Sequence, residues 1–363
     1  MNESRSNIAS PYMEWSKTRS QARFSLATSG IANVSMDEFP VRLEDLEITG
    51  GAGYGYEELQ ERLAAKAGVP VECVVQSNGT SMANFLAMAG CLDPGDEVLV
   101  EQPTYQLLLS AARFLGARVR RFSRRFEDGF RVDPEEVRRQ ITPTTRLIVV
   151  TNLHNPSGLL MDEAVLGEIG EIAQGVGARV LMDEVYLDMA FSRRPSTAFH
   201  LGPHFVVTNS LTKVYGLSGL RCGWILAEAE LARRIWRLND LMDASYSRLT
   251  ERMSVMALDH LQKFADRSRK LLETNRRLLD RFLDSRQDLE VVRPEFGTIV
   301  FPRLTHGTAN DFCKLLRDRF ETTVVPGDFF EMPRHFRLGI GGDSKTLEAG
   351  LERLGAALNV FQG

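Results

Sequence analysis

The sequence predicts an α/β fold in which a large domain, with a mostly parallel sheet between helices, precedes a smaller α+β domain. Three observations predict it. Short apolar runs alternate with helical patterns between residues 97 and 208. A long stretch rich in Leu, Arg and Asp follows, from about residue 230 to 285. Short β-rich runs and a terminal helical pattern then complete the chain.

The parallel sheet of the large domain is predicted from four runs of β-favouring residues. A helical pattern at residues 162–174 separates two of them, and strands that alternate with helices form parallel sheets with helices on both faces. We place this domain at residues 45–235. The four predicted strands are residues 97–100, 146–151, 178–182 and 205–208.

The smaller domain is predicted from the last third of the chain. Residues 230–285 favour a nearly continuous helix, and a terminal helix is expected from Lys345. We place this domain at residues 236–363 and expect the N-terminal arm, residues 1–44, to pack on it as part of the same unit. Its short strands are predicted at residues 298–301, 323–325 and 336–338.

Composition limits the functions that are open to the chain. It has 363 residues and a net charge of −4, which excludes a general electrostatic attraction to nucleic acid. No apolar run is long enough for a membrane span, and the first residues lack the apolar core of a signal peptide, so a cytoplasmic protein is expected. The cysteines form no C-x-x-C pair, and no metal site is expected from them; they are Cys73, Cys91, Cys222 and Cys313.

One stretch of the chain is locally basic. Residues 118–125 contain five arginines, which we interpret as a solvated edge strand and turn rather than as a phosphate-binding patch. Only Phe122 and Phe126 are interleaved with them, which is too few for a stacking platform on nucleic-acid bases.

Side chains that carry chemistry follow four of the predicted strands. The carboxyl ends of parallel strands meet at one edge of a sheet, where ligands bind in doubly wound folds. These ends supply an amide, a carboxylate with a phenol, a hydroxyl with an amine, and an aromatic ring. A pyridine aldehyde phosphate needs all of these groups together, so the sequence predicts pyridoxal 5'-phosphate as the cofactor. The residues are Asn155, Asp183 with Tyr186, Ser210 with Lys213, and Tyr105.

Each of these side chains matches one part of the cofactor. Lys213 supplies the amine that forms a Schiff base with the aldehyde. Asp183 keeps the ring nitrogen protonated, so that the ring draws electrons from the substrate. Asn155 and Tyr186 donate to the phenolate oxygen, and Tyr105 packs on the ring face.

The phosphate of the cofactor is expected at the start of a helix. Gly79, Thr80 and Ser81 come just before a helical pattern, and a helix N-terminus offers backbone N–H groups to an anion. Ser210 adds a hydroxyl and Arg221 a charge-assisted contact.

The ordered set of these motifs resembles the class I/II aminotransferase family of fold-type I pyridoxal-phosphate enzymes. The acid and the lysine are 30 residues apart (213 − 183), as in that family, and the resemblance covers essentially the whole chain. The motifs are HNPSG at residues 154–158, DEVY at 183–186, SLTK at 210–213, GLSGLRCGW at 216–224 and FRLG at 336–339.

The resemblance implies further roles. Lys213 is then also the base that moves the α-proton, and Arg337 grips the substrate's α-carboxylate. Gly30 and Asn155 line the substrate pocket. The family's dimeric sites imply a homodimer, with Tyr54 as a candidate for reaching the phosphate of the partner subunit, although Tyr56 fits that role as well.

The resemblance implies transfer of an amino group from an L-amino acid to a 2-oxo acid. Other reactions of the same cofactor stay open, namely β- or γ-elimination, decarboxylation, and oxidation or cyclisation, because the same residues serve all of them. A non-enzymatic regulatory protein is the remaining alternative. The sequence offers no clear candidate for a second arginine that would bind a side-chain carboxylate of the substrate, so a dicarboxylate substrate is not supported. We expect the N-terminal arm, with Tyr12, Trp15 and Arg19, to close over the pocket.

Overall fold

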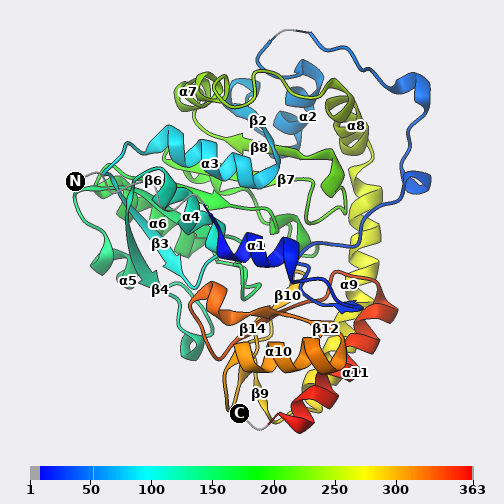
Figure 1. Cartoon of the computed structure of the whole chain (residues 1–363). Helices are drawn as coiled ribbons and strands as arrows, with labels where there is room; N and C mark the ends of the chain where they lie inside the picture. The colour runs from blue at the N-terminus through cyan, green and yellow to red at the C-terminus, as the bar shows by residue number, and fades with distance from the viewer. Residues whose placement is uncertain (1–8, 52, 362–363) are drawn as a thin grey trace.

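A seven-stranded sheet forms the centre of the N-terminal two thirds of the chain (Figure 1). The computed structural model describes residues 9–51 and 53–361. The strands are parallel except β8, which runs antiparallel to both of its neighbours. The four predicted strands correspond to β3, β5, β6 and β7. In spatial order the strands are β2 (Val74–Asn78), β8 (Cys222–Leu226), β7 (Phe205–Ser210), β6 (Arg179–Asp183), β5 (Thr145–Thr151), β3 (Glu97–Gln102) and β4 (Arg118–Ser123).

Helices cover both faces of this sheet, and we call the whole the sheet unit. Alternate residues of one strand serve opposite faces: Leu147 and Val149 belong to one core cluster, and Ile148 and Val150 to the other. Both faces are therefore buried, which explains the nearly unbroken apolar sequence of the central strands. The helices are α3 (Gly79–Cys91), α4 (Gln106–Phe114) and α7 (Ala229–Asn239) on one face, and α2 (Glu57–Ala67), α5 (Pro134–Gln140) and α6 (Glu163–Gly175) on the other.

The prediction of one continuous helix over residues 230–285 is wrong. Three helices occupy it, α7, α8 (Arg248–Asp259) and α9 (Leu261–Asp284). The first break follows Asn239, whose side-chain amide donates to the phenol of Tyr246, and this phenol donates to the carbonyl of Gln76 on β2. These tertiary contacts hold the segment against the sheet and override its helical propensity.

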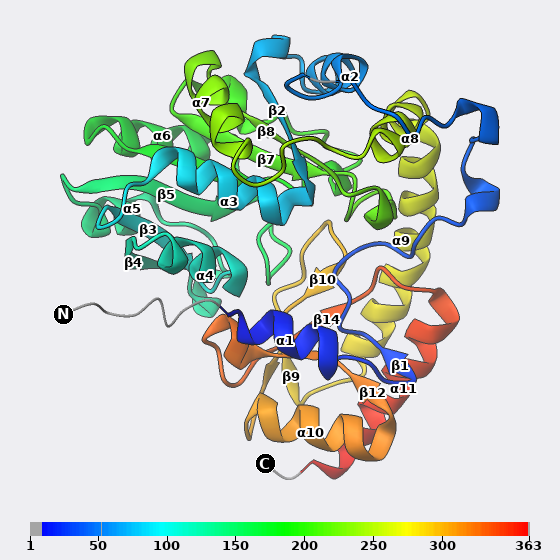
Figure 2. The same ribbon diagram turned by 45° about the horizontal axis from the view of Figure 1, so that its top comes forward.

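A second unit, the C-terminal unit, contains three small sheets and two long helices (Figure 2). Helix α9 runs down from the sheet unit along its side. The N-terminal arm joins this unit because β1 (Phe24–Ser25) pairs in parallel with β12 (Thr322–Thr323). The other elements are α1 (Pro11–Thr18), β9 (Leu289–Glu290), β10 (Ile299–Val300), β11 (Arg303–Leu304), α10 (Ala309–Phe320), β13 (Val325–Pro326), β14 (Phe336–Gly339) and α11 (Ser344–Val360).

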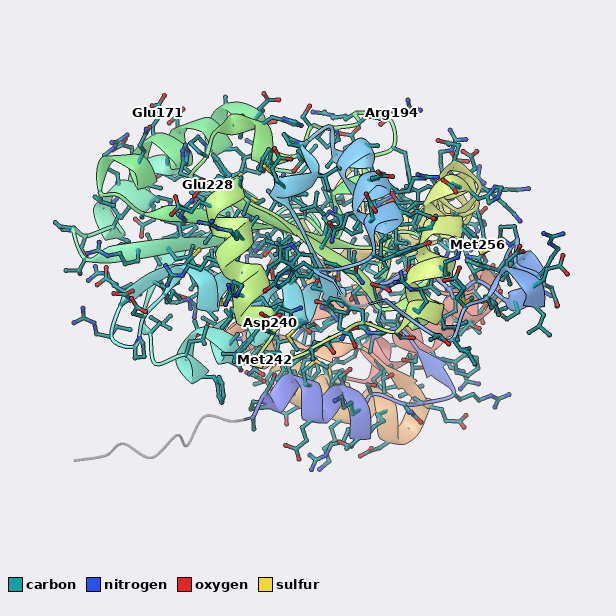
Figure 3. The ribbon with its side chains drawn as sticks, turned by 90° about the horizontal axis from the view of Figure 1, so that it is seen from above. Glu171, Arg194, Glu228, Asp240, Met242 and Met256 are labelled. Carbon is teal, nitrogen blue, oxygen red and sulfur yellow. The ribbon has the colours of Figure 1, made fainter. Side chains whose placement is uncertain are left out.

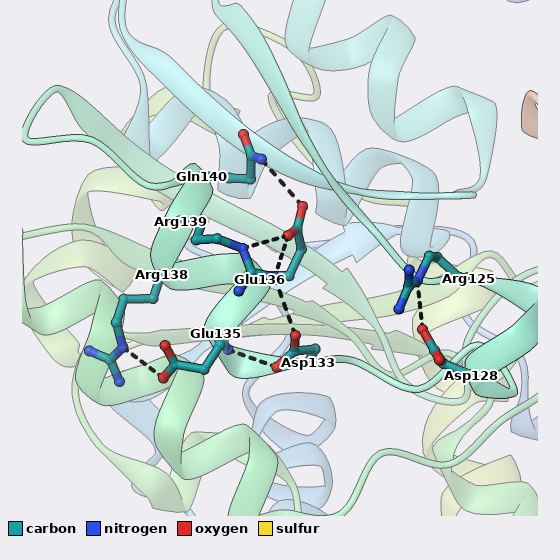
Figure 4. A network of polar contacts seen from close by, with 8 residues as sticks. All are labelled: Arg125, Asp128, Asp133, Glu135, Glu136, Arg138, Arg139 and Gln140. Carbon is teal, nitrogen blue, oxygen red and sulfur yellow. Dashed lines mark hydrogen bonds and ion pairs between the residues drawn. The ribbon is translucent and has the colours of Figure 1, made fainter.

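The basic stretch at residues 118–125 is only partly the solvated edge that its sequence predicts. Strand β4 is the edge strand, and Arg125 pairs with Asp128 on the surface, next to the ion pairs of α5 (Figure 4). Arg124, however, is buried and bonds Glu101 at 2.7 Å. The prediction was wrong at this residue because its partner lies on the neighbouring strand β3, which the local sequence does not reveal.

No helix in the described part of the chain is both long and apolar enough to cross a membrane. The same residues contain no group of three or more His, Cys, Asp or Glu side chains that could hold a metal ion.

Candidate active site

The predicted site residues meet where the carboxyl ends of the parallel strands face the C-terminal unit. Asp183 is the last residue of β6, and Lys213 follows the end of β7. Asn155 lies in the turn after β5. Arg337 comes from the other side, from β14 of the C-terminal unit. Both units therefore contribute to one site.

Lys213 is half-buried, and the pKa of its amine is low. Burial, assisted by the positive charge of Arg337, lowers the pKa of Lys213 to about 8. The amine donates a hydrogen bond to Oγ of Ser29, 3.1 Å away. Much more of the amine is thus neutral near neutral pH than in an exposed lysine, and the neutral form is the one that attacks an aldehyde or accepts a proton.

Asp183 is a buried carboxylate that has no cationic partner among the salt bridges of the described residues. Its Oδ2 accepts from Nδ2 of Asn84 at 2.8 Å, and its Oδ1 accepts from the backbone N–H of Val185 at 3.1 Å. Thr208 in turn donates to Oδ1 of Asn84 at 2.6 Å, which fixes the amide. Burial raises the pKa of Asp183 to about 6. A carboxylate held in this way fits a protonated ring nitrogen.

Tyr186 is buried and its hydroxyl donates to Oγ of Ser29 at 2.8 Å. Burial raises the pKa of Tyr186 to about 12, so the phenol stays protonated and remains a donor at neutral pH. Ser29 thus lies between Tyr186 and Lys213.

Arg337 is a buried guanidinium, 1% exposed, without a carboxylate partner among the salt bridges of the described residues. Its Nη1 donates to Oδ1 of Asn155 at 2.9 Å, and its Nη2 donates to the hydroxyl of Tyr12 at 2.8 Å and the carbonyl of Ala27 at 3.2 Å. Its Nε has no hydrogen-bond partner in the described structure. A buried cation with a free donor fits an anionic group of a ligand.

The start of α3 forms a cradle of donors. Gly79 has a φ of +76°, and a Cβ at this position would lie 2.4 Å from Nη2 of Arg221. The hydroxyl of Thr80 donates to Oγ of Ser210 at 2.8 Å. Ser81, in the first turn of the helix, is exposed. Backbone N–H groups, two hydroxyls and a guanidinium at a helix N-terminus suit a phosphate.

Two more predicted residues lie against these groups. Tyr105 packs edge-on against the ring of Tyr12 with the centroids 5.5 Å apart, and its hydroxyl donates to Sδ of Met13. A Cβ on Gly30 would lie 3.4 Å from Cδ of Lys213, so the arm passes close along the lysine.

Tyr54 lies on a different surface. Its side chain is 51% exposed and its hydroxyl donates to Asp240, which follows the end of α7 (Figure 3). Within the described chain, its hydrogen bond and its ring contact with Trp236 connect it to none of the residues around Lys213.

Sequence reasoning missed Ser29 and Asn84. Asn84 lies in the middle of a helical pattern that reads as core, and only its position one helical turn beyond the predicted phosphate cradle signals a role. Ser29 directly precedes Gly30, which was predicted to line the substrate pocket, and this position next to Gly30 is the signal that could have identified it.

Comparisons with known proteins show the family and the fold. A family model described as aminotransferase class I and II matches residues 47–354. Capreomycidine synthase from Streptomyces vinaceus is 30% identical over 96% of this chain and 94% of its own length. Arginine–pyruvate transaminase from Pseudomonas aeruginosa is 29% identical, over 82% of this chain and 78% of its own. A crystal structure of a PLP-dependent aminotransferase from Streptococcus suis matches all of both chains with a TM-score of 0.92 at 29% identity.

A structure titled PLP-dependent cyclase OrfR also matches, with a TM-score of 0.87 at 26% identity over 97% of both chains. The fold of the present chain is therefore shared by proteins that are named for different reactions.

Proposed function

The chain belongs to the class I and II aminotransferase family, whose enzymes use pyridoxal phosphate, and from this premise we propose that it moves an amino group from an L-amino acid to a 2-oxo acid. The observation that carries the proposal is the convergence of three ionisable groups, of which Asp183 and Arg337 are buried and Lys213 is half-buried. Each of the three lacks a complementary charged partner among the described salt bridges. A protonated ring nitrogen would pair with Asp183, a substrate carboxylate with Arg337, and an aldehyde would react with the amine of Lys213.

The residues around Lys213 fit pyridoxal phosphate. Asp183 would hold the ring nitrogen, Tyr186 and Asn155 the ring oxygen, and Tyr105 a face of the ring. When bound, the cofactor supplies an electron sink for the charge left at the substrate's Cα when a bond there breaks. The phosphate would lie in the cradle of Gly79, Thr80, Ser81, Ser210 and Arg221.

The protein's own contribution begins with the orientation of the substrate. Arg337 binds the α-carboxylate, because its buried guanidinium has a free Nε donor and is itself oriented by Asn155 and Tyr12. Lys213, freed by the substrate's amino group, removes the proton from Cα. Its lowered pKa provides the neutral amine that this step requires. Asp183 keeps its negative charge throughout and favours the protonated ring nitrogen.

A second candidate function is cyclisation or elimination at the same site. The observation that favours it is the match to capreomycidine synthase, which extends over 96% of this chain, together with the cyclase OrfR at a TM-score of 0.87. The first steps are common to both candidates, since Arg337 orients the substrate and Lys213 removes the Cα proton in each. They differ in where this proton is returned and which group leaves.

One experiment separates the two candidates. The enzyme loaded with pyridoxal phosphate is mixed with a panel of L-amino acids that includes arginine, and the visible absorption of the bound cofactor is followed. Lasting loss of the starting band with one equivalent of 2-oxo acid supports amino transfer. Return of the starting band with release of ammonia, water or a ring-closed product supports the second candidate. Lys213→Ala should abolish both products, and product formation by this variant contradicts the proposal.

We also propose a homodimer. Ile48 and Tyr54 line one hollow together with Asp240, and Leu241 and Met242 directly follow Asp240, which Figure 3 shows at the end of α7. The three apolar side chains are exposed, Ile48 90%, Leu241 79% and Met242 51%. Apolar groups gathered on a surface mark an interface. Covering this surface with a second copy would place Tyr54 at the boundary between subunits. Sedimentation of the wild type and of Leu241→Glu tests it: we expect a dimer that the charge weakens, and a wild-type monomer contradicts it.

A further inference from the structure

Ser29 contacts both Lys213 and Tyr186, two residues of the site that are distant from it in the sequence. Its Oγ accepts from the amine of Lys213 at 3.1 Å and from the hydroxyl of Tyr186 at 2.8 Å. The side chain is 7% exposed, so water does not substitute for these contacts readily. A hydroxyl has two acceptor positions and one donor position. Lys213 and Tyr186 use both acceptor positions, and the proton of Ser29 remains to be donated.

The backbone around Ser29 is fixed from several sides. Its carbonyl accepts from Oγ1 of Thr298 at 2.7 Å, and the N–H of Ile31 donates to the carbonyl of Lys213 at 2.9 Å. A Cβ added to Gly341 would lie 2.1 Å from the carbonyl oxygen of Gly30, which shows how closely the two backbones approach. The hydroxyl is therefore presented from a rigid segment, as precise orientation of a reacting group requires.

We propose that Ser29 is a positioning residue that holds the free amine of Lys213 during the Cα proton transfer, and that links this amine to the phenol of Tyr186. The inference rests on the proposed function in that Lys213 carries the cofactor. In the enzyme loaded with cofactor, the amine of Lys213 is free only while the substrate has displaced it, and it then needs a fixed partner so that it does not rotate away from Cα. The Ser29 hydroxyl provides this partner on the side of the N-terminal arm.

The contact also favours the charged form of the amine, because Ser29 accepts a hydrogen bond from it. Three charged groups also act on the same amine. Arg337 from β14 and Arg221 from the end of the turn before β8 lower its pKa, whereas Asp183 from β6 raises it. Tyr186 is neutral and reaches the amine only through Ser29. Replacing Ser29 leaves these groups in place, so a change in titration reports on the hydroxyl.

The test compares Ser29→Ala with Ser29→Thr in the full-length protein. The first readout is the rate at which the cofactor-free protein takes up pyridoxal phosphate as a function of pH, followed by absorption. Uptake needs the neutral amine, so the wild-type uptake rate should increase with pH, and the midpoint of this increase should lie at about pH 8. Ser29→Ala should move the midpoint down by about one pH unit, since a hydrogen bond to a charged group is lost. Ser29→Thr keeps a hydroxyl and should restore the midpoint.

The second readout is steady-state kinetics of the loaded enzyme. Ser29→Ala should lower kcat about tenfold through the misplaced amine and leave KM within about twofold, because Arg337 still binds the carboxylate. Thr298→Val is the matched control: it removes the donor to the Ser29 carbonyl but leaves the hydroxyl, and its uptake midpoint should match the wild type.

Either of two results overturns the inference: a Ser29→Ala midpoint and kcat that equal the wild type, or a Thr298→Val midpoint that shifts as far as that of Ser29→Ala. Failure of the proposed function has a different signature. In that case the wild type takes up the cofactor, and the Ser29 midpoints are still measured, but no amino acid yields a 2-oxo acid.

Discussion

The guanidinium of Arg337 donates a hydrogen bond to the phenol of Tyr12 over 2.8 Å, and this bond joins the middle strand of a C-terminal sheet to the N-terminal helix. The arginine is buried, and Asn155 of the sheet unit holds its other terminal nitrogen. The substrate's carboxylate would therefore meet a cation that two separate parts of the chain, the N-terminal arm and the sheet unit, orient. Such a cation binds an anion without a large cost of reorganisation.

Replacing Arg337 should weaken substrate binding more than the chemical step. Arg337→Lys keeps the charge but loses the planar fork, and we expect KM to rise roughly 100-fold, as the loss of a charge-assisted pair of hydrogen bonds implies. Tyr12→Phe removes one orienting contact only and should raise KM by a smaller factor. Steady-state kinetics with the amino donor measure both, and an unchanged KM in Arg337→Lys argues against this role.

Replacing Asp183 should impair the chemistry and spare the uptake of the cofactor. Asp183→Asn is nearly isosteric but neutral, so the ring nitrogen loses its ionic partner, and we expect kcat to fall about 10²–10³-fold, as for other preorganised electrostatic contacts. Absorption at saturating cofactor should still show the wild-type stoichiometry, because Lys213 and the phosphate cradle are intact. Asn84→Ala, which removes a single donor to Asp183, should show the same effect at about a tenth of the size. Full activity of Asp183→Asn would refute the assignment.

A methyl group at Gly79 should reduce the affinity for pyridoxal phosphate. Its Cβ would lie 2.4 Å from Nη2 of Arg221 and displace that side chain from the cradle. We expect Gly79→Ala to raise the Kd at least about tenfold, the scale of one charge-assisted contact. The matched control is Gly177→Ala, whose φ of +72° imposes similar backbone strain but whose Cβ meets no atom within 4 Å. Equal losses of affinity in the two variants would assign the effect to strain alone.

Arg124 and Glu101 should stabilise the fold only when both are present. Both side chains are buried, at 1% and 0% exposure, and Glu101 also accepts from the backbone N–H of Thr151. Arg124→Met leaves a buried carboxylate without its cation and should cost about 3–5 kcal/mol. The double variant Arg124→Met/Glu101→Gln should lose less than the sum of the two single changes, as denaturant unfolding and a double-mutant cycle would measure. Additive losses would show that the two groups are not coupled.

Four of the seven strands of the large sheet, and the residues that follow them, could be predicted from the sequence because both depend on local patterns. The chemical groups directly follow apolar runs, so knowing where β5, β6 and β7 end already places Asn155, Asp183 and Lys213 on one edge. The family match supports the fold and the cofactor that this pattern predicts.

The features that the sequence concealed depend on partners distant along the chain. Ser29 lies 184 residues from Lys213, and Asn84 lies 99 residues from Asp183, so neither contact leaves a local pattern. The burial of Arg124 likewise depends on a neighbouring strand. Patterns of hydrophobicity indicate which face of a helix or strand is buried, but they do not indicate which polar group of another element contacts that face.

The pairing of β1 with β12 has a consequence for the order in which the protein is completed during synthesis. Phe24 is made before its partner Thr322, which follows 298 residues later along the chain (322 − 24). At a synthesis rate of about 5–20 residues per second, roughly 15–60 s pass between the synthesis of β1 and that of its partner strand β12. All seven strands of the large sheet lie between these two residues, so that sheet is made before the arm can pair with the C-terminal unit.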